Sequence, residues 1–474
     1  MTEIKAGRAS KLPDRDHYKR QHRDIEEATP RQRTGVILAL TWPALAEALL
    51  GSLASIVDMM MVSGLGTHAV SAVGLVTQPK FILMAVFLAM NVGTTALVAR
   101  FRGADDRKSA NIVLRQTIFL CIVLSVVICG IMLAVNKPLI AWIAGPEMSK
   151  DTLQLGMDYF AIQLYGFPLV ALTMGINAIL RGSGNTRTAF FTNTLANIVN
   201  VFFNYCLIGG NLGFPAWGVA GASLATVIGQ GAGFVLALMA ILRGNDFLRL
   251  DFRTRFRIDW SMIKRILRIG SPAMVEQLIM RVGMMIYTMT ITRLGDNSYA
   301  AHIIANNIQS LSFTVGQGFG TASTTLVGQC LGRKRPDLAE AYVIRTRALC
   351  LIVSTTVGAV LIFLGGPMAR MYTADTEVIH LAATVLMIVG VMQPLQSGQM
   401  VLSSGLRGAG DTLSTAISIC VGILIIRPAL SQVAINVFDM GLVGAWLAFV
   451  IDQSFRYFFC LFRFRSEKWK HIRV

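Results

Sequence analysis

The chain has 474 residues, of which 54% are hydrophobic and 15% are charged, and its formal net charge is +17. So apolar a composition excludes an ordinary soluble domain and predicts a protein embedded in a lipid bilayer. Nucleic acid is not expected as a partner, because a protein that binds it gathers basic and aromatic residues on one folded face.

Apolar runs recur along the whole sequence, and each is long enough to cross a hydrocarbon core of about 30 Å as a helix. The predicted helices cover twelve spans, at 34–62, 69–99, 111–135, 155–180, 188–209, 216–242, 262–294, 299–331, 344–370, 378–406, 412–436 and 440–463. The segment 1–33 is polar and lacks the apolar centre of a signal sequence, so we expect a tail.

The basic residues concentrate in the two tails and in the connections from even-numbered to odd-numbered helices. The exceptions are Lys137, Lys150, Arg293 and Arg370 in the other connections and Lys80, Arg281, Arg427 and Arg456 inside predicted helices. By the positive-inside rule, this asymmetry predicts that both termini are cytoplasmic, in a multi-pass protein of the inner (plasma) membrane.

The second half of the sequence repeats the first. At an offset of 229, Pro43 matches Pro272 and Glu47 matches Glu276; "LRGSGNT" at 180 matches "LRGAGDT" at 406, and "GVAGASLATVIGQ" at 218 matches "GLVGAWLAFVIDQ" at 441. Six helices per copy is an even number, so both copies enter the membrane from the same side. The fold class expected is therefore all-α, with two six-helix lobes related by a pseudo-two-fold axis along the membrane normal.

This duplication predicts the domain organisation. The parts are an N-terminal tail (1–33), an N-lobe (34–242), a basic cytoplasmic linker (243–261), a C-lobe (262–463) and a C-terminal tail (464–474). A cleft between two such lobes is where a substrate would bind. The seven cysteines show no CxxC pair and are interpreted as small packing residues.

Motifs for nucleotide-driven or enzymatic chemistry are missing from the sequence: it has no GxxxxGK[ST] loop, no HExxH and no GxSxG. We therefore expect no enzyme activity and no cofactor. A transporter of this kind would draw on an ion gradient or on the gradient of its own substrate.

Three features together resemble the multidrug and toxic compound extrusion (MATE) family: the first helix with "VDMMMVSGLG", the doubled "LRGxGxT" and the doubled "GxxGAxxA". The resemblance runs from about Thr34 to Arg463. It implies a monomeric exporter of small organic, mostly cationic and amphipathic compounds, in antiport with protons or sodium ions. The alternative is a lipid-linked precursor flippase of the same superfamily, for which more helices and a more basic cleft would be expected.

Asp58 is an aspartate within an apolar run, and a charged residue at bilayer depth usually faces a protein interior or a water-filled cavity. The alternative is that it simply reaches water at the outer interface. Glu47 lies eleven residues earlier on the same face. A stripe of asparagines at 193, 197, 200 and 204 follows one face of the fifth helix and serves either as interhelical glue or as ligands.

The family resemblance implies a coupling site for a cation or proton. Carried onto this sequence, its residues are Asp58, Asn200, Asn204, Thr226 and the carbonyl of Ala222. Asn204 departs from the aspartate common among relatives, which removes a negative charge and disfavours sodium, although sodium stays possible as the only metal. One carboxylate in a water-poor setting favours protons as the coupling ion.

The second lobe has Tyr287 where the first has Asp58, which predicts that coupling belongs to one lobe. Glu276, like Glu47 a secondary acidic candidate, is expected to form a structural ion pair with Arg281 and Arg427, or else to attract a cation.

For the substrate cleft, the sequence offers residue types suited to binding varied shapes. The candidates for its lining are Met61, Gln78, Met284 and Tyr287.

Overall fold

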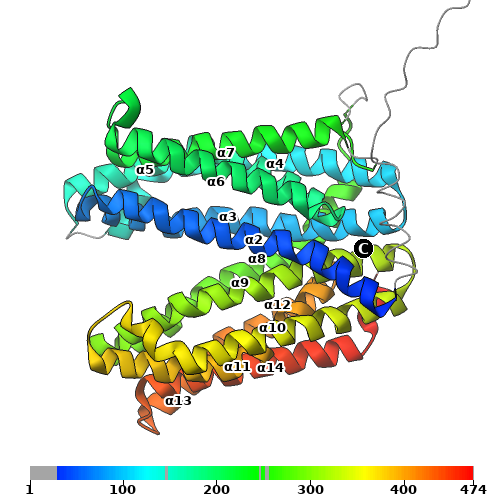
Figure 1. Cartoon of the computed structure of the whole chain (residues 1–474). Coiled ribbons are helices and arrows are strands. Elements are labelled where there is room, and N and C mark those ends of the chain that lie inside the picture. The colour runs from blue at the N-terminus through cyan, green and yellow to red at the C-terminus, as the bar shows by residue number, and fades with distance from the viewer. Residues whose placement is uncertain (1–28, 145–147, 245–246, 251–255, 473–474) are drawn as a thin grey trace, which may run out of the picture.

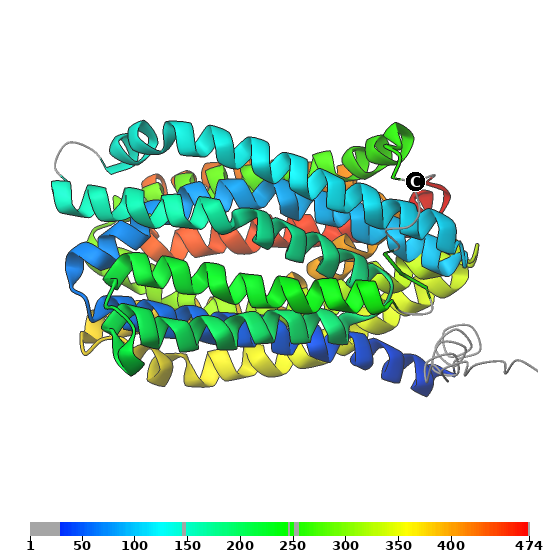
Figure 2. The ribbon, with the colours of Figure 1, turned by 90° about the horizontal axis from the view of Figure 1, so that it is seen from above.

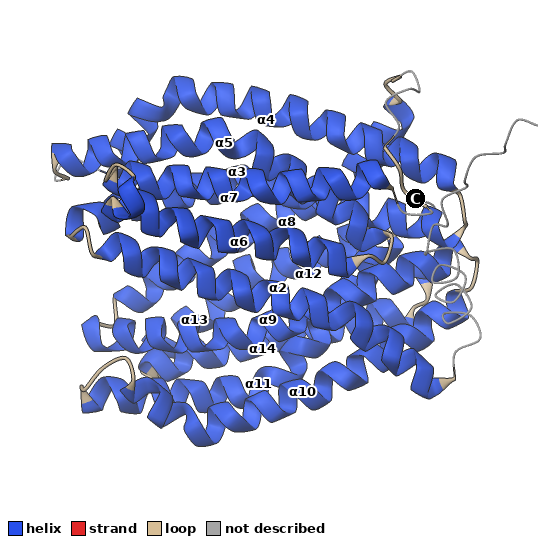
Figure 3. Cartoon of the chain, turned by 45° about the horizontal axis from the view of Figure 1, so that its top comes forward, coloured by secondary structure: helices blue, strands red, loops and turns tan. Residues whose placement is uncertain are grey.

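The computed structural model describes residues 29–144, 148–244, 247–250 and 256–472. Most of the predicted N-terminal tail (1–33) and part of the predicted linker (243–261) lie outside these residues. Within the described part every element is helical, and no strand occurs (Figure 3). An all-α fold was predicted and is confirmed.

Among the described residues, twelve long helical segments follow one another, if α12, η2 and α13 are taken as one. The N-terminal six are α2 (Pro30–Ser63), α3 (Thr67–Gly103), α4 (Arg107–Ala144), α5 (Lys150–Gly182), α6 (Thr186–Gly209) and α7 (Gly218–Arg243). The C-terminal six are α8 (Trp260–Thr292), α9 (Asp296–Gly332), α10 (Pro336–Arg370), α11 (Thr376–Ala409), the composite α12 (Thr412–Cys420), η2 (Val421–Ile426) and α13 (Arg427–Asn436), and α14 (Gly441–Arg465). Short 3-10 turns follow α6 (η1, Asn211–Gly213) and α14 (η3, Lys468–His471).

Nine of these segments are long and apolar enough to cross a membrane by length and composition alone, within the described residues. The other three are α6, α8 and α9. They carry more polar side chains, and α6 and α8 hold five of the eleven site residues named from the sequence. The others lie on α2, α3 and α7, so the candidate sites combine the more polar helices with apolar ones.

The largest boundary error concerns α4, which was predicted to end at 135 and continues to Ala144. Asn136 and Lys137 interrupt the apolar run after residue 135, yet the helix continues because it packs on α5. There Asn136 Nδ2 donates to the backbone oxygen of Met157 at 3.0 Å. Hydropathy marks where the apolar span ends, whereas hydrogen bonds and packing decide where the helix ends.

The two sets of six helices form two lobes. In Figure 1, α2 to α7 lie in the upper half and α9 to α14 in the lower half, and the two groups diverge away from the end that holds the C terminus. Figure 2 shows the helices of both lobes running roughly along one common direction. This is the arrangement that a duplication with an even number of helices predicts.

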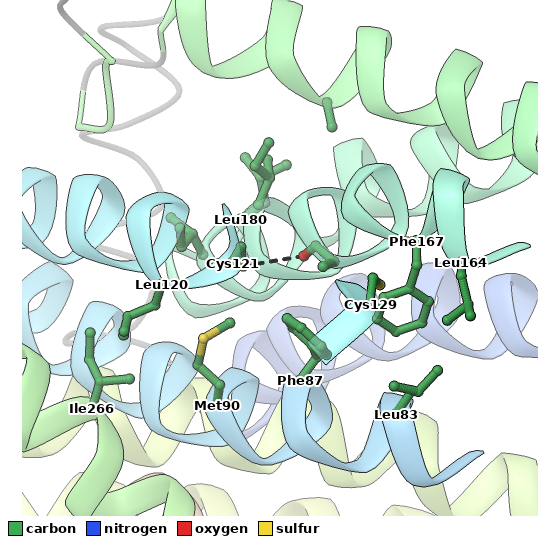
Figure 4. Packing of buried hydrophobic residues seen from close by; sticks show 14 of the residues in the cluster. Leu83, Phe87, Met90, Leu120, Cys121, Cys129, Leu164, Phe167, Leu180 and Ile266 are labelled. Carbon is green, nitrogen blue, oxygen red and sulfur yellow. Dashed lines mark hydrogen bonds between the residues drawn. The ribbon is translucent and has the colours of Figure 1, made fainter. Parts of the chain in front are cut away.

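The first helix of each lobe begins in the opposite lobe. Ile266 and Ile269 of α8 are buried in the apolar core of the N-lobe, as the close-up in Figure 4 shows for Ile266. Ile37 and Leu40 of α2 are buried in a core of the C-lobe in the same way. The sequence boundaries at 34 and 262 therefore do not coincide with the packing boundaries.

A proline marks the crossing point in each case. Pro43 lies inside α2 and Pro272 inside α8, at matching positions of the repeat and just after the exchanged segments. A proline within a helix removes one backbone hydrogen bond and allows a bend. Each first helix can therefore serve both lobes, with its proline at the junction.

The lobes touch closely at the end that carries the two "LRG" turns. A Cβ on Gly103 would lie 2.0 Å from the backbone oxygen of Gln329, and one on Gly332 would lie 2.0 Å from that of Arg100. Across the same seam, Thr325 Oγ1 donates to the Arg181 carbonyl at 3.1 Å. Only glycine permits such an approach of two backbones, so these residues fix how the lobes meet.

All seven cysteines are free thiols, and six of them are buried. Cys121 donates to the backbone oxygen of Ala171 at 3.3 Å within the N-lobe core (Figure 4). Their interpretation as packing residues is confirmed.

The C-terminal tail (464–474) packs against the C-lobe where it is described. Trp469 is buried and stacks on Phe464 with 5.1 Å between ring centroids, and its indole donates to the Phe464 carbonyl at 2.8 Å.

Candidate functional site: a polar cluster around Asp58

Asp58 lies near the end of α2 and is half-buried against α6. Asn204 Nδ2 donates to its carboxylate at 2.5 Å. Three turns earlier on both helices, Asn193 Nδ2 donates to Glu47 at 2.6 Å. The eleven-residue spacing that places Glu47 and Asp58 on one face is thus matched by eleven residues on α6, because the two helices run in parallel.

Asn200 links the carboxylate to α7. The amide orientation that satisfies its neighbours has the nitrogen donating to both Asp58 oxygens, at 2.9 and 3.1 Å, and the oxygen accepting from the Thr226 backbone N–H at 3.2 Å. The Thr226 hydroxyl donates to the Ala222 carbonyl at 3.0 Å. The structure therefore brings together all five residues named for the coupling site, from three helices.

The cluster has unused hydrogen-bond acceptors. Asn204 Oδ1 is buried and has no hydrogen-bond partner among the described residues. It lies beside a carboxylate that already accepts several N–H bonds. Acceptors without donors suit a proton or a small cation. Lys80 on α3 interacts electrostatically with Asp58, although the sequence did not indicate it as part of this site.

Glu47 belongs to a separate network. Arg181 Nη1 lies 3.1 Å from its carboxylate, and Asn193 is also held by Asn177 at 3.2 Å. The asparagine stripe of α6 therefore divides into two parts. Asn193 links helices at Glu47, whereas Asn200 and Asn204 surround Asp58.

Glu276 forms an ion pair, but the partners expected from the sequence were wrong. Arg407 Nη1 lies 2.6 Å from the Glu276 carboxylate, and Thr415 Oγ1 lies 3.4 Å from it. Arg281 instead stands over the ring of Phe81 on α3, 3.9 Å from its centroid. Nearness in sequence favoured Arg281, although five residues along a helix places two side chains on different faces.

Arg427 pairs with a residue that the sequence analysis did not consider. Its Nη2 lies 2.6 Å from Asp452 Oδ2, and Arg456 Nη2 lies 3.0 Å from the same oxygen. Asp452 is fully buried in α14. The spacing of Asp452 and Arg456, four residues apart in an apolar helix, is a signal that would have indicated this pair.

The four residues expected at the substrate cleft have different surroundings. Met284 and Gln78 are exposed, and Met61 is half-buried. Tyr287 is 3% exposed and lies in the core of the C-lobe, so it is not part of a surface with Met284. Tyr287 was expected only as part of the cleft lining, and its ring instead packs in the C-lobe core, as an aromatic side chain of this size favours.

Among the described residues, no group of three or more His, Cys, Asp or Glu side chains lies close enough together to hold a metal ion.

Two repeated six-helix lobes, joined by a glycine seam and carrying one polar cluster in the first lobe, define a polytopic membrane protein with the build of a transporter. The family model MatE matches residues 43–206 and 272–433, and the chain belongs to this family, that of the multidrug and toxic compound extrusion transporters. It is accordingly a transporter rather than an enzyme.

Relatives match the chain over nearly its full length. A "probable multidrug resistance protein NorM" from Thermotoga maritima is 30% identical over 454 residues, which cover 95% of this chain and 96% of the relative. The "uncharacterized transporter YisQ" from Bacillus subtilis is 24% identical and covers 93% of this chain and 96% of its own length.

Solved structures share the fold. A crystal structure described as MATE in the bent conformation has a TM-score of 0.86 at 22% identity, covering 94% of this chain and 97% of that one. A transporter of the MOP superfamily from Pyrococcus furiosus has a TM-score of 0.85 at 22% identity, with the same coverage. The two-lobe, twelve-helix architecture is thereby confirmed.

Proposed function

We propose that the chain is a secondary active multidrug efflux transporter, which exports organic, mostly cationic and amphipathic compounds in exchange for protons. Membership of the MatE family and the name of the Thermotoga maritima relative support multidrug efflux. The observation that carries the coupling part is the cluster around Asp58, where asparagines of α6 hold a single carboxylate within the N-lobe.

Proton coupling is favoured over sodium by the charge of this cluster. Asn204 contributes an amide where an acid would add a second negative charge. A sodium ion is held by several oxygens with net negative charge. A proton needs one carboxylate only, and binding it removes the charge of Asp58.

The mechanism follows from what protonation does to the hydrogen bonds. Ionised Asp58 accepts from Asn204 and Asn200 and so ties α2 to α6 and, through Asn200, to α7. A protonated carboxyl has less acceptor capacity and must place a donor of its own, so the network rearranges. The proline of α2 lets that change alter the packing of the helix between the lobes.

Transport requires that substrate and proton prefer opposite states. An organic cation binds while Asp58 is ionised, and protonation from the outer side then removes the charge that attracts it. Only such a difference in affinity can shift the equilibrium between the two states.

The proposal also includes the predicted topology, location and domain limits. The protein is a monomer in the inner membrane, and both of its termini face the cytoplasm. Its N-lobe spans 34–242 and its C-lobe 262–463. Met61, Gln78 and Met284 are proposed to contact the cationic, apolar body of the substrate, whereas Tyr287 lies buried in the C-lobe core.

Efflux of an organic cation such as ethidium from an efflux-deficient bacterial host tests the role of Asp58. Asp58→Asn should abolish efflux at unchanged protein level, because it removes the ionisable group and keeps the shape. Asp158→Asn, the same change at an exposed residue of α5, is the matched control and should leave efflux intact. Full efflux by the Asp58 variant contradicts the proposed mechanism.

A second experiment, with everted vesicles in sodium-free potassium buffer, identifies the coupling ion independently of the efflux test. An imposed pH gradient should drive dye uptake by the wild type and not by Asp58→Asn. Uptake driven by a sodium gradient alone, with the pH gradient collapsed, would overturn proton coupling and leave the efflux function standing.

A further inference from the structure

Five side chains of the C-lobe form a closed ring of contacts. Tyr287 on α8 touches His302 on α9, with ring centroids 5.6 Å apart, and His302 touches Trp446 on α14 at 5.5 Å. Trp446 touches Phe449 at 5.3 Å. The Arg427 guanidinium on α13 closes the ring, 4.4 Å from the Phe449 centroid and 5.4 Å from that of Tyr287.

Three polar atoms of this ring are buried without a hydrogen-bond partner among the described residues. They are Tyr287 Oη, His302 Nδ1 and Trp446 Nε1, in side chains that are 3%, 2% and 1% exposed as whole residues. Buried polar atoms nearly always find a partner, because leaving one unpaired costs about 1–3 kcal/mol. Three in one ring indicate a common partner.

All three are donors. Indole N–H can only donate, and a phenol donates readily. The Asn306 amide nitrogen lies 2.7 Å from His302 Nε2, so Nε2 accepts and the proton of the neutral imidazole lies on Nδ1. Arg427 Nη1 adds a fourth donor, whose contact is the weakly accepting sulfur of Met284 at 3.6 Å. The partner that fits is an acceptor.

The charge balance points the same way. Two arginines, Arg427 and Arg456, share the single carboxylate of Asp452. The next acid in this lobe, Glu276, already has Arg407 as its partner. The buried cluster therefore holds one positive charge in excess, and a positive charge inside a membrane protein requires a counter-charge.

We propose that this ring binds a small monovalent anion. Within the repeat it occupies the position of the Asp58 cluster with the polarity reversed: Tyr287 replaces Asp58, Phe449 replaces Thr226, and Arg427 follows directly after the equivalent of Asn200. The first lobe offers acceptors and the second offers donors. The anion is either a halide from the medium or the carboxylate of a zwitterionic substrate, since both have the same chemistry.

Thermal unfolding of the purified protein in detergent tests the site without any transport assay. Potassium chloride and potassium acetate are titrated against potassium methanesulfonate, which has no carboxylate and is larger than a halide, at constant ionic strength. The wild type should show a saturable rise in Tm with chloride, with acetate, or with both, because a ligand of the native state stabilises it. A response to acetate alone assigns the carboxylate; a response to chloride identifies a free halide.

Removing one donor at a time locates the binding. Trp446→Phe and Tyr287→Phe should each weaken the apparent anion affinity about tenfold, as expected for one hydrogen bond to a charged partner. The controls are Trp217→Phe and Tyr205→Phe, which change exposed residues and should keep the wild-type affinity. Crystals grown with bromide should show an anomalous peak inside the ring.

Two results would overturn the proposal. One is equal Tm in chloride, acetate and methanesulfonate at all concentrations, which means that water alone satisfies the donors. The other is an anion effect that both ring variants retain at wild-type affinity. If either variant fails to fold, the bromide peak in the wild-type crystal decides. Neither result bears on efflux, so this proposal and the proposed function can fail separately.

Discussion

Each lobe contains its own copy of one ion pair, but the side chains around Asp58 differ from those at the equivalent position of the C-lobe. Glu47 pairs with Arg181 in the N-lobe, and Glu276 pairs with Arg407 in the C-lobe. Each arginine comes from an "LRG" turn and each glutamate follows the repeated proline. A pair kept in both copies is part of the scaffold, whereas Asp58, present in one copy, belongs to the function of that lobe.

The pairs differ in their surroundings. The Glu276 side chain is 2% exposed, and that of Glu47 is 19% exposed. The C-lobe also has Asp452 where the N-lobe has Gly229, and with it a second buried pair. Buried ion pairs thus stabilise the C-lobe, whereas in the N-lobe the functional carboxylate accepts hydrogen bonds from side-chain amides. Hydrogen bonds from amides to a carboxylate rearrange on protonation more readily than a buried ion pair breaks.

The largest effect is expected at Asp452. Asp452→Asn leaves two buried arginines without a counter-charge and should lower the free energy of unfolding by about 3–5 kcal/mol, as breaking a buried pair does. Urea or thermal unfolding in detergent measures the loss, with folded yield as a second readout. Asp58→Asn serves as the contrast, because its stability should change by less than about 1 kcal/mol. Equal losses would contradict a C-lobe locked by charge.

A smaller difference separates the two repeated pairs. Glu276→Gln should cost about 3 kcal/mol of stability, because the carboxylate and most of its partner are buried. Glu47→Gln should cost about 1 kcal/mol, because water screens the more exposed pair and Asn193 can still bond to an amide oxygen. The comparison uses the same measurement on both variants. A larger loss for Glu47→Gln would show that exposure does not set the strength of these pairs.

The sequence predicted the helices well because hydropathy and periodicity are local properties. Asn200, Asn204 and Thr226 were placed through family resemblance, and their meeting at Asp58 needed three helices to be packed correctly. The partner of Glu276 was missed because the expected partners, Arg281 and Arg427, lie inside predicted helices, whereas Arg407 falls just beyond the predicted helix end at 406. Arg181 and Arg407 are equivalent in the repeat, and so are Glu47 and Glu276. A glutamate and an arginine that occur in both copies are a signal for an ion pair in each lobe.

The burial of Tyr287 could not be read from its helix alone. The periodicity of α8 shows which residues share a face, but not whether that face meets lipid, the other lobe or the core. The exchange of the first helices between lobes was equally hidden, since apolar residues such as Ile37 and Ile266 suit either core. Tertiary packing determines both the burial of Tyr287 and the lobe in which the start of each first helix is buried.

The lobe seam offers a symmetric test. Gly103→Ala and Gly332→Ala each place a methyl group 2.0 Å from a backbone oxygen of the other lobe, and each should cost about 2 kcal/mol, the usual cost of overpacking. Because the two glycines are repeat equivalents, their losses should be similar. Gly74→Ala, with open space around its Cβ, is the control and should be neutral or slightly stabilising. Strongly unequal losses would show that the seam does not follow the pseudo-symmetry.

The smallest effect is expected where the lobes begin equivalent helices differently. Asp106 Oδ1 accepts from the Ser109 backbone N–H at 3.0 Å and so caps α4, whereas Arg335, its repeat equivalent, makes no side-chain cap for α10. Asp106→Ala should therefore cost about 1 kcal/mol, and Arg335→Ala much less. Hydrogen exchange in the first turns of α4 and α10 measures both effects locally.

The Asp106 cap should also depend on pH. Hydrogen bonds from Ser109 lower the pKa of Asp106 below its ordinary value of 3.8. A depressed pKa in the folded state adds stability that is complete above the unfolded value and is lost as the pH falls through the folded one. Protection of the first turn of α4 should thus fall on acidification below 3.8, and Asp106→Ala should abolish that dependence. The first turn of α10 also holds a carboxylate with a lowered pKa, Asp337, which Arg335 contacts, so the control is Asp106→Ala itself. A pH dependence of the α4 turn that this variant retains would show that the loss arises from general acid unfolding instead of from the cap.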